Sequence, residues 1–298
     1  MNACSGEPVA VLASAGVATW EGMALLAATT FIAAAVNSVA GGGTILTFPV
    51  VAALVPPGAA QLVTANATST IGLFPGAVAA AWAYRGERVG MPSWIRWLLP
   101  VSVVGGACGA VLVLALPSRL FATLVPWLIL AAAVLFAIQP QLAALIQRRS
   151  RSPLDSGPVG GATRLVVAGL LQLLVSIYGG YFGAGIGILM LAVLGCLGLG
   201  DIHRLNGVKN VLAMVVNGTT AAVFAAASMM PASGGSGTAL VATIGPGVVS
   251  WPHAGVMAVS AVAGGLAGAG LARRLPAAAV RRLVALIGFG LAGYYFLR

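Results

Sequence analysis

Long apolar stretches, separated by short polar or charged clusters, run through most of the chain. Their lengths and spacing predict helices at residues 22–38, 44–55, 58–83, 94–116, 120–138, 164–182, 186–198, 204–228, 251–271 and 278–297. Helices 44–55 and 186–198 are too short to cross the roughly 30 Å hydrocarbon core of a membrane at about 1.5 Å per residue. Each follows a Gly-rich break, so we expect each to be the second arm of a re-entrant hairpin.

The two Gly-rich breaks belong to an internal duplication, because other features recur after them in the same order. The recurrences are Gly41-Gly42-Gly43 as Gly185-Ile186-Gly187, Asn66 as Asn210, Gly105-Gly106 as Gly264-Gly265, and Leu116-Pro117 as Leu275-Pro276. The second copy is longer before Trp251 than the first is before Trp94, and such loops are where repeats tolerate insertion. We therefore expect two copies of one structural unit.

The composition fits a membrane protein and excludes a soluble domain. Hydrophobic residues make up 60% of the chain, charged residues 7%, and the mean hydropathy is +1.03. The runs are too long and too continuously apolar for a β-barrel. The net charge of +10 reflects arginines at membrane boundaries, so no nucleic-acid partner is predicted. Three scattered cysteines and the absence of nucleotide-binding or hydrolase motifs predict no metal, no cofactor and no enzyme.

The distribution of arginines predicts the topology. With the hairpins entering and leaving on one face, nearly all basic residues fall on one side, which the positive-inside rule makes cytoplasmic, with both termini outside. Each copy then holds a hairpin plus three crossings, so the two copies are inverted. The predicted fold is an all-α polytopic membrane protein with two inverted repeats. Its parts are a tail (1–21), repeat 1 (22–140), a basic cytoplasmic linker (141–163) and repeat 2 (164–298).

Two segments of the chain resemble a known family. Residues 37–46 (NSVAGGGTIL) with Pro49, and residues 178–190 (YGGYFGAGIGILM) followed by 206–210 (NGVKN), are similar to the signature halves of the TauE/SafE sulfite exporter family. The resemblance covers roughly residues 22–298. It implies a permease of the bacterial inner membrane for sulfite, sulfonates or related organosulfur anions. The first copy departs from the second in having Ala65 where Lys209 stands.

Inverted repeats with broken helices are typical of secondary transporters, whose substrate sites lie where the breaks meet. Lys209 is the only lysine and lies inside a predicted helix, so it is either an anion ligand or a residue that snorkels to the cytoplasmic surface. The neutral donors near the breaks can equally cap helices or join neighbouring helices. The candidate substrate-binding residues are Asn37, Gly41, Gly42, Gly43, Thr44, Asn66, Ser69, Tyr181, Gly183, Gly185, Gly187, Lys209 and Asn210. Gly105xxxGly109 and Gly264xxxGly268 are predicted to serve helix packing alone.

All five acidic residues fall in the tail, in loops or at helix starts, which disfavours a carboxylate-based proton or sodium site. Outward movement of an anion needs no coupling ion when the cytoplasm is negative. The predicted function is export of sulfite or a small organosulfonate, with the lipid bilayer and the small anion as partners. Import coupled to protons or exchange, and a non-transport membrane scaffold, remain open. The sequence assigns no oligomeric state.

Overall fold

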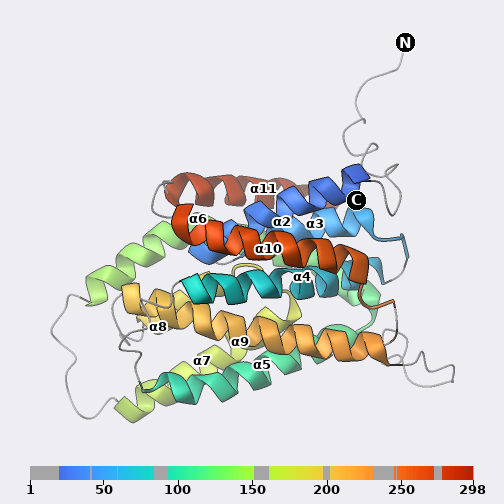
Figure 1. Cartoon of the computed structure of the whole chain (residues 1–298). Helices are drawn as coiled ribbons and strands as arrows, with labels where there is room; N and C mark the ends of the chain where they lie inside the picture. The colour runs from blue at the N-terminus through green and yellow to red at the C-terminus, as the bar shows by residue number, and fades with distance from the viewer. Residues whose placement is uncertain are drawn as a thin grey trace.

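The computed structural model describes residues 20–40, 42–58, 60–83, 93–150, 161–196, 202–230, 245, 247–271 and 277–297. Within them the chain forms ten helices and no strand, arranged as an elongated bundle (Figure 1). The first half contains α2 (Trp20–Ala40), α3 (Thr44–Leu54), α4 (Gln61–Ala83), α5 (Ile95–Ala115) and α6 (Ser118–Ser150). The second half contains α7 (Gly161–Tyr181), α8 (Ile186–Cys196), α9 (Ile202–Met229), α10 (Trp251–Leu271) and α11 (Ala277–Leu297).

The structure confirms every predicted helix, most of them to within a few residues. Five helices are long and apolar enough to cross a membrane, judged over the described residues: α2, α4, α5, α6 and α9. The short helices α3 and α8 contain 11 residues each and therefore reach only about 16 Å along their axes. That length is about half of a hydrocarbon core.

One predicted boundary is wrong. The helix expected at 120–138 continues as α6 to Ser150, through Pro140. A proline removes one backbone hydrogen bond and crowds the carbonyl four residues earlier, yet a helix can continue past it. Here the apolar residues from Leu142 to Leu145 resume the helical pattern directly after the proline, so part of the predicted linker is helical.

The two halves pack by exchanging a helix. Helix α10 of the second half lies against α2 and α4 of the first, and α5 of the first half lies against α7 and α9 of the second (Figure 1). The central pairs are α4 with α9 and α6 with α11. This pattern is unchanged when the halves are interchanged, as expected of a duplicated unit related to its copy by a two-fold axis.

Small residues make the exchange possible, as the two glycine patterns predicted. A Cβ atom on Gly264 would collide with the backbone carbonyl of Phe31 in α2, and one on Gly105 would collide with Ser176 in α7. Both glycines are thus at points where helices approach too closely for any side chain. The prediction that these glycines serve packing is confirmed.

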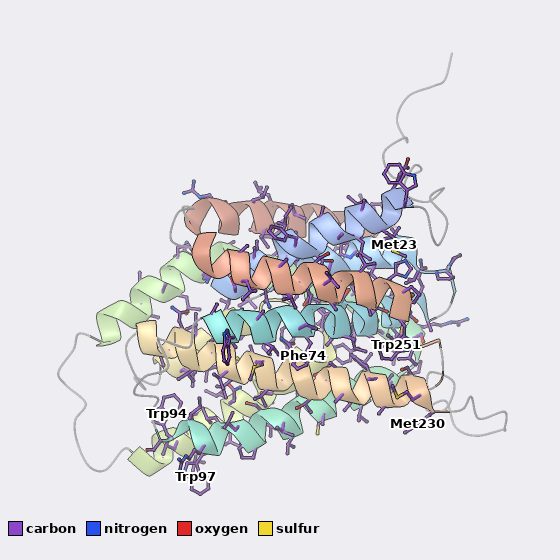
Figure 2. The ribbon with its side chains drawn as sticks, in the orientation of Figure 1. Met23, Phe74, Trp94, Trp97, Met230 and Trp251 are labelled. Atoms are coloured by element: carbon purple, nitrogen blue, oxygen red, sulfur yellow. The ribbon has the colours of Figure 1, made fainter. Side chains whose placement is uncertain are left out.

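Equivalent helices begin at opposite ends of the bundle. Trp251, at the start of α10, lies at the same end as Met23 and Met230, whereas Trp94 and Trp97, at the start of α5, lie at the other end (Figure 2). Inverted repeats require this arrangement. The placement of the two ends relative to the cytoplasm stays a prediction.

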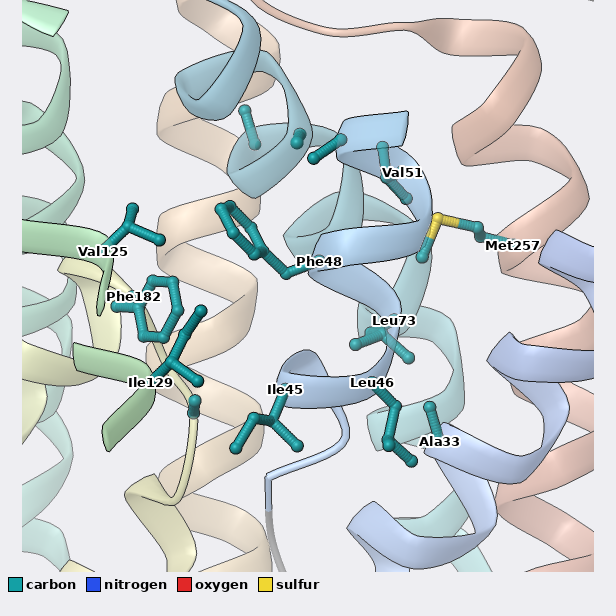
Figure 3. Close-up of a cluster of buried hydrophobic side chains, with 14 of the residues drawn as sticks. Ala33, Ile45, Leu46, Phe48, Val51, Leu73, Val125, Ile129, Phe182 and Met257 are labelled. Atoms are coloured by element: carbon teal, nitrogen blue, oxygen red, sulfur yellow. The ribbon is translucent and has the colours of Figure 1, made fainter. Parts of the chain in front are cut away.

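The interior of the first half surrounds the short helix α3. Phe48 is fully buried and packs edge-on against Phe182 of the second half, with ring centroids 5.4 Å apart. Val125 and Ile129 of α6 approach from one side, and Leu73 and Met257 lie on the other (Figure 3). The short helix is therefore held by both halves of the chain.

We predict that Gly264→Ala destabilises the protein by about 1–3 kcal/mol, because the added methyl group overpacks the contact with α2. Gly255→Ala in the same helix is the matched control, since a Cβ atom there meets nothing within 4 Å. The control should be neutral or slightly stabilising. Thermal unfolding of the purified proteins in detergent measures both. Equal midpoints for the two variants would contradict the packing assigned to Gly264.

Candidate anion-binding site

The breaks before the two short helices are built on glycine. Gly42, Gly183 and Gly185 have φ angles of 134°, 78° and 76°, which side-chain-bearing residues rarely adopt. The chain can therefore reverse within one or two residues at each break. We call residues 42–44 the first tip and residues 183–185 the second tip.

The two tips touch each other. A Cβ atom on Gly42 would lie 2.9 Å from the backbone nitrogen of Gly185, and one on Gly183 would lie 3.8 Å from Thr44 Oγ1. The side chain of Phe136 in α6 closes over the same point, 2.5 Å from the Gly42 Cβ position. The prediction that the tips approach each other is confirmed. Their depth in the membrane stays a prediction.

Side chains from the preceding helices fix both tips. Asn37 Oδ1 accepts a hydrogen bond of 2.7 Å from the Gly42 N–H group, and Tyr178 donates its hydroxyl to the Ala184 carbonyl at 2.7 Å. Each bond satisfies a backbone group that the helix break would leave without an intrahelical partner. Because Oδ1 serves the tip, the NH₂ group is the part of Asn37 that can serve a solute.

A small cavity opens beside the tips, between α2, α4, α8 and α9. Its volume is about 20 Å³, and four of the candidate residues, Asn37, Gly187, Lys209 and Asn210, line it. The other lining residues are Ser38, Ala77, Ala80, Ile186, Ala213 and Asn217. The structure therefore brings a cation, three side-chain amides and the first turn of α8 to one place.

Lys209 gives this cavity its charge. Its side chain is 1% exposed, so the alternative of an ammonium group reaching the surface by snorkelling does not describe it. A positive charge at the wall of a cavity favours an anion as its occupant. The start of α8, where Ile186 and Gly187 line the cavity, adds the positive end of a helix dipole.

Three other candidates lie apart from the cavity, in its counterpart in the other half. Asn66 and Ser69 of α4 are fully buried, and Asn66 Nδ2 donates a 3.0 Å hydrogen bond to the Tyr181 carbonyl. The Tyr181 ring packs against Phe121, with centroids 5.6 Å apart. Asn66 Oδ1, Ser69 Oγ and the Tyr181 hydroxyl have no hydrogen-bond partner among the described residues.

The remaining candidates form the framework of the tips. Gly42, Gly43, Thr44, Gly183 and Gly185 lie at or between the tips and are not among the residues that line the cavity. Gly41 lies outside the described residues. Gly42 and Gly183 lie where the two tips meet, whereas Gly43 lets the first tip approach α2, because a Cβ atom there would collide with the Ala33 carbonyl.

Sequence reasoning missed two polar residues of the cavity. Neither Ser38 nor Asn217 is among the candidates from the sequence, although Asn217 follows Asn210 by two helical turns and so faces the same way. The amide of Gln172, by contrast, joins α7 to α5: its Nε2 donates to the hydroxyls of Ser102 in α5 and Ser176 in α7 at 3.0 and 3.2 Å. The seven-residue spacing from Asn210 could have separated these two cases.

Comparison with known proteins agrees with this architecture. The model of the family described as sulfite exporter TauE/SafE matches residues 26–295. A "Probable membrane transporter protein ORF9" of Sinorhizobium sp is 29% identical over 166 residues, a match that covers 55% of this chain and 58% of that protein. The match thus spans less than two thirds of the relative's length. No solved structure matches the chain.

We predict that Gly42→Ala and Gly185→Ala separate two reasons for glycine at the tips, the positive φ angle and the close contact between the tips. At Gly185 a Cβ atom has ordinary contacts, the nearest at 3.5 Å, so alanine meets only backbone strain of about 1–2 kcal/mol. At Gly42 the same substitution also collides with Phe136 and Gly185, so we expect a larger loss of stability. Thermal unfolding in detergent compares the variants, and a Gly42→Ala protein at least as stable as Gly185→Ala would contradict the tip-to-tip contact.

Proposed function

We propose that this chain, which belongs to the sulfite exporter TauE/SafE family, is a secondary carrier that exports sulfite or a small organosulfonate across the bacterial inner membrane. The observation that carries the proposal is the buried Lys209 in an amide-lined cavity at the meeting point of two interrupted helices. Broken helices that face each other offer backbone dipoles to a solute in other secondary transporters. No metal or cofactor enters the proposal.

The donors around the cavity suit a small oxyanion. The Lys209 ammonium group brings a positive charge and N–H donors, and the amides of Asn37, Asn210 and Asn217 add neutral donors. Sulfite and sulfonate groups carry three oxygen acceptors in a compact pyramid, so several donors can bind one group at once. Charge-assisted hydrogen bonds of this kind are the stronger ones.

The size of the cavity restricts the substrate. A volume of about 20 Å³ is close to what a single water molecule needs, so the cavity must widen to admit an anion. Ala77, Ala80 and Ala213 have no side-chain rotamers to change, so this widening requires α4 and α9, which carry them, to move. We therefore expect compact anions to bind better than those with long organic chains.

Membrane voltage favours the outward direction. Moving one negative charge out of a negative cytoplasm gains about 2.3 kcal/mol per 100 mV, and a dianion gains about twice as much. Import of the same anion would need protons or a counter-substrate to offset this energy. In proteoliposomes, sulfite flux driven by an imposed potential alone supports export. Flux that requires a pH gradient or an exchanged anion supports import, and absence of flux supports a scaffold.

We predict that Lys209→Ala weakens sulfite binding by about 1.5–3 kcal/mol, or one to two decades in affinity, because a charge-assisted hydrogen bond is lost. Arg119→Ala, which removes one positive charge from an exposed position at the start of α6, is the matched control and should bind like the parent. Lys209→Arg should recover only part of the affinity, because a guanidinium group holds its donors in a larger, planar fork.

Stabilisation of the purified protein by increasing sulfite concentrations gives these affinities, since a ligand that binds the folded state raises its stability. A Lys209→Ala protein that sulfite stabilises as strongly as the parent would remove Lys209 from the site. Equal losses in Lys209→Ala and Arg119→Ala would show that overall charge, and not the cavity, attracts the anion.

A further inference from the structure

The duplication gives each residue of the cavity a counterpart in the other half, and several counterparts differ in size or polarity. Small or polar residues of the cavity correspond to bulky apolar or aromatic residues at four positions. The pairs are Asn37 with Tyr181, Ser38 with Phe182, Ala80 with Phe224, and Asn217 with Leu73. In addition, Lys209 corresponds to Ala65, while Asn210 corresponds to Asn66.

The counterpart region is closed. Phe224 is 0% exposed and Phe182 is 1% exposed, and both belong to one buried cluster with Leu73, Tyr181 and Ala65. Phe182 is held in this position by its edge-on contact with Phe48 (Figure 3). The same fold is therefore hollow at Lys209 and filled at Asn66.

The packing of α4 on α9 brings Phe224 to the level of the polar residues of α4. A Cβ atom on Gly218 would lie 2.8 Å from the Phe74 ring, and Ala77 and Ala80 share the cavity with Lys209 and Asn210. The two helices thus run antiparallel. Toward the start of α4, the same register places Phe224 of α9 level with Asn66 of α4, just as Asn210 of α9 is level with Ala80 of α4.

The closed region contains polar atoms whose hydrogen-bonding capacity is unused. Asn66 Oδ1 and Ser69 Oγ are fully buried and have no partner among the described residues. A buried polar atom without a partner destabilises the state that contains it. Such atoms are tolerated where another conformation, or a solute, provides the missing bond.

We propose that Phe224, together with Phe182 and Leu73, is the closed gate of the anion pathway on the side opposite to the Lys209 cavity. In the alternative conformation these side chains withdraw, and Asn66 and Ser69 line the opening as Asn210 and Ala213 line the present one. The proposal rests on the carrier function proposed above. It adds which residues close the second mouth and which polar atoms the solute meets there.

The gate also predicts a difference between the two conformations. The opening at Asn66 has Ala65 where the opening at Lys209 has an ammonium group. An anion therefore interacts more strongly with the conformation described here, and its binding shifts the population toward that conformation. The uncharged side is the side of weaker binding.

Accessibility of single cysteines tests the gate without any anion. In a background with Cys4, Cys108 and Cys196 replaced by serine, Ser69→Cys probes the closed side and Ala213→Cys, at the counterpart position, probes the open cavity. The Ag⁺ ion, a membrane-impermeant thiol reagent small enough for a cavity of about one water molecule, is applied in chloride-free buffer to right-side-out and inside-out vesicles. The thiols that remain are then counted by labelling the unfolded protein with a maleimide. We expect the cysteine at 213 to react from one face only and the cysteine at 69 to react at least about tenfold more slowly, because it is buried.

Adding Phe224→Ala should raise the reactivity of the cysteine at 69 by about tenfold or more, and from the opposite face, because truncating a buried phenylalanine strongly weakens the closed packing. Phe289→Ala, on the exposed side of α11, is the matched control and should change nothing. Phe224→Leu removes less volume and should give an intermediate increase, which keeps the test valid if the alanine variant fails to insert.

Three results would overturn the gate: equal reactivity at 69 and 213 in the parent, no change with either Phe224 variant, or an increase at 69 from the same face as 213. These outcomes are independent of sulfite binding. If sulfite does not bind but the cysteines react as expected, sulfite is rejected as the substrate and the gate proposal stands. If sulfite binds but the Phe224 variants do not change the reactivity at 69, the gate proposal alone is rejected.

Discussion

The fold of this protein depends on one constraint: the backbone N–H and C=O groups at its two helix breaks need protein partners inside a membrane-spanning bundle. Polar backbone groups at a helix break cannot be left to lipid, so each break must be satisfied by protein. Here each break is covered by the other half: the first tip lies against Gly185, and the second lies against Thr44. Asn37 and Tyr178 bond the tips from their own halves. A side chain at Gly42 would separate the tips, so the glycine is required by contact as well as by φ angle.

The exchange of α5 and α10 between the halves has a functional consequence. Because each of these helices packs on the other half, the two halves interlock, and the cavity forms between them, lined by α2 and α4 of one half and by α8 and α9 of the other. Duplication alone would give two equal sites. The difference between Lys209 and Ala65, and between Ala80 and Phe224, makes one site charged and hollow and the other neutral and filled. A carrier with one hollow half at a time can expose a solute to one side only.

Much of the fold could be predicted from the sequence, because a membrane span needs a long apolar run and the breaks need glycine. The end of α6 could not, since Pro140 interrupts the pattern without ending the helix. The site was harder to predict. Asn66 and Asn210 occupy equivalent positions, yet one donates to a backbone carbonyl in a packed region and the other lines a cavity. Phe224 and Phe182 fill the region around Asn66, and both lie far from Asn66 along the sequence. The pattern of residues around Asn66 therefore gives no sign of them.

The location of the anion is the central claim, and an anomalous diffraction experiment tests it most directly. Selenite has the shape and charge of sulfite and contains an atom with a strong anomalous signal. Crystals grown with selenite should show one intramembrane peak, within hydrogen-bond distance of the Lys209 ammonium group and the amides of Asn37 and Asn210. A peak at another place in the bundle, or an intramembrane peak that persists unchanged in Lys209→Ala crystals, would contradict the account.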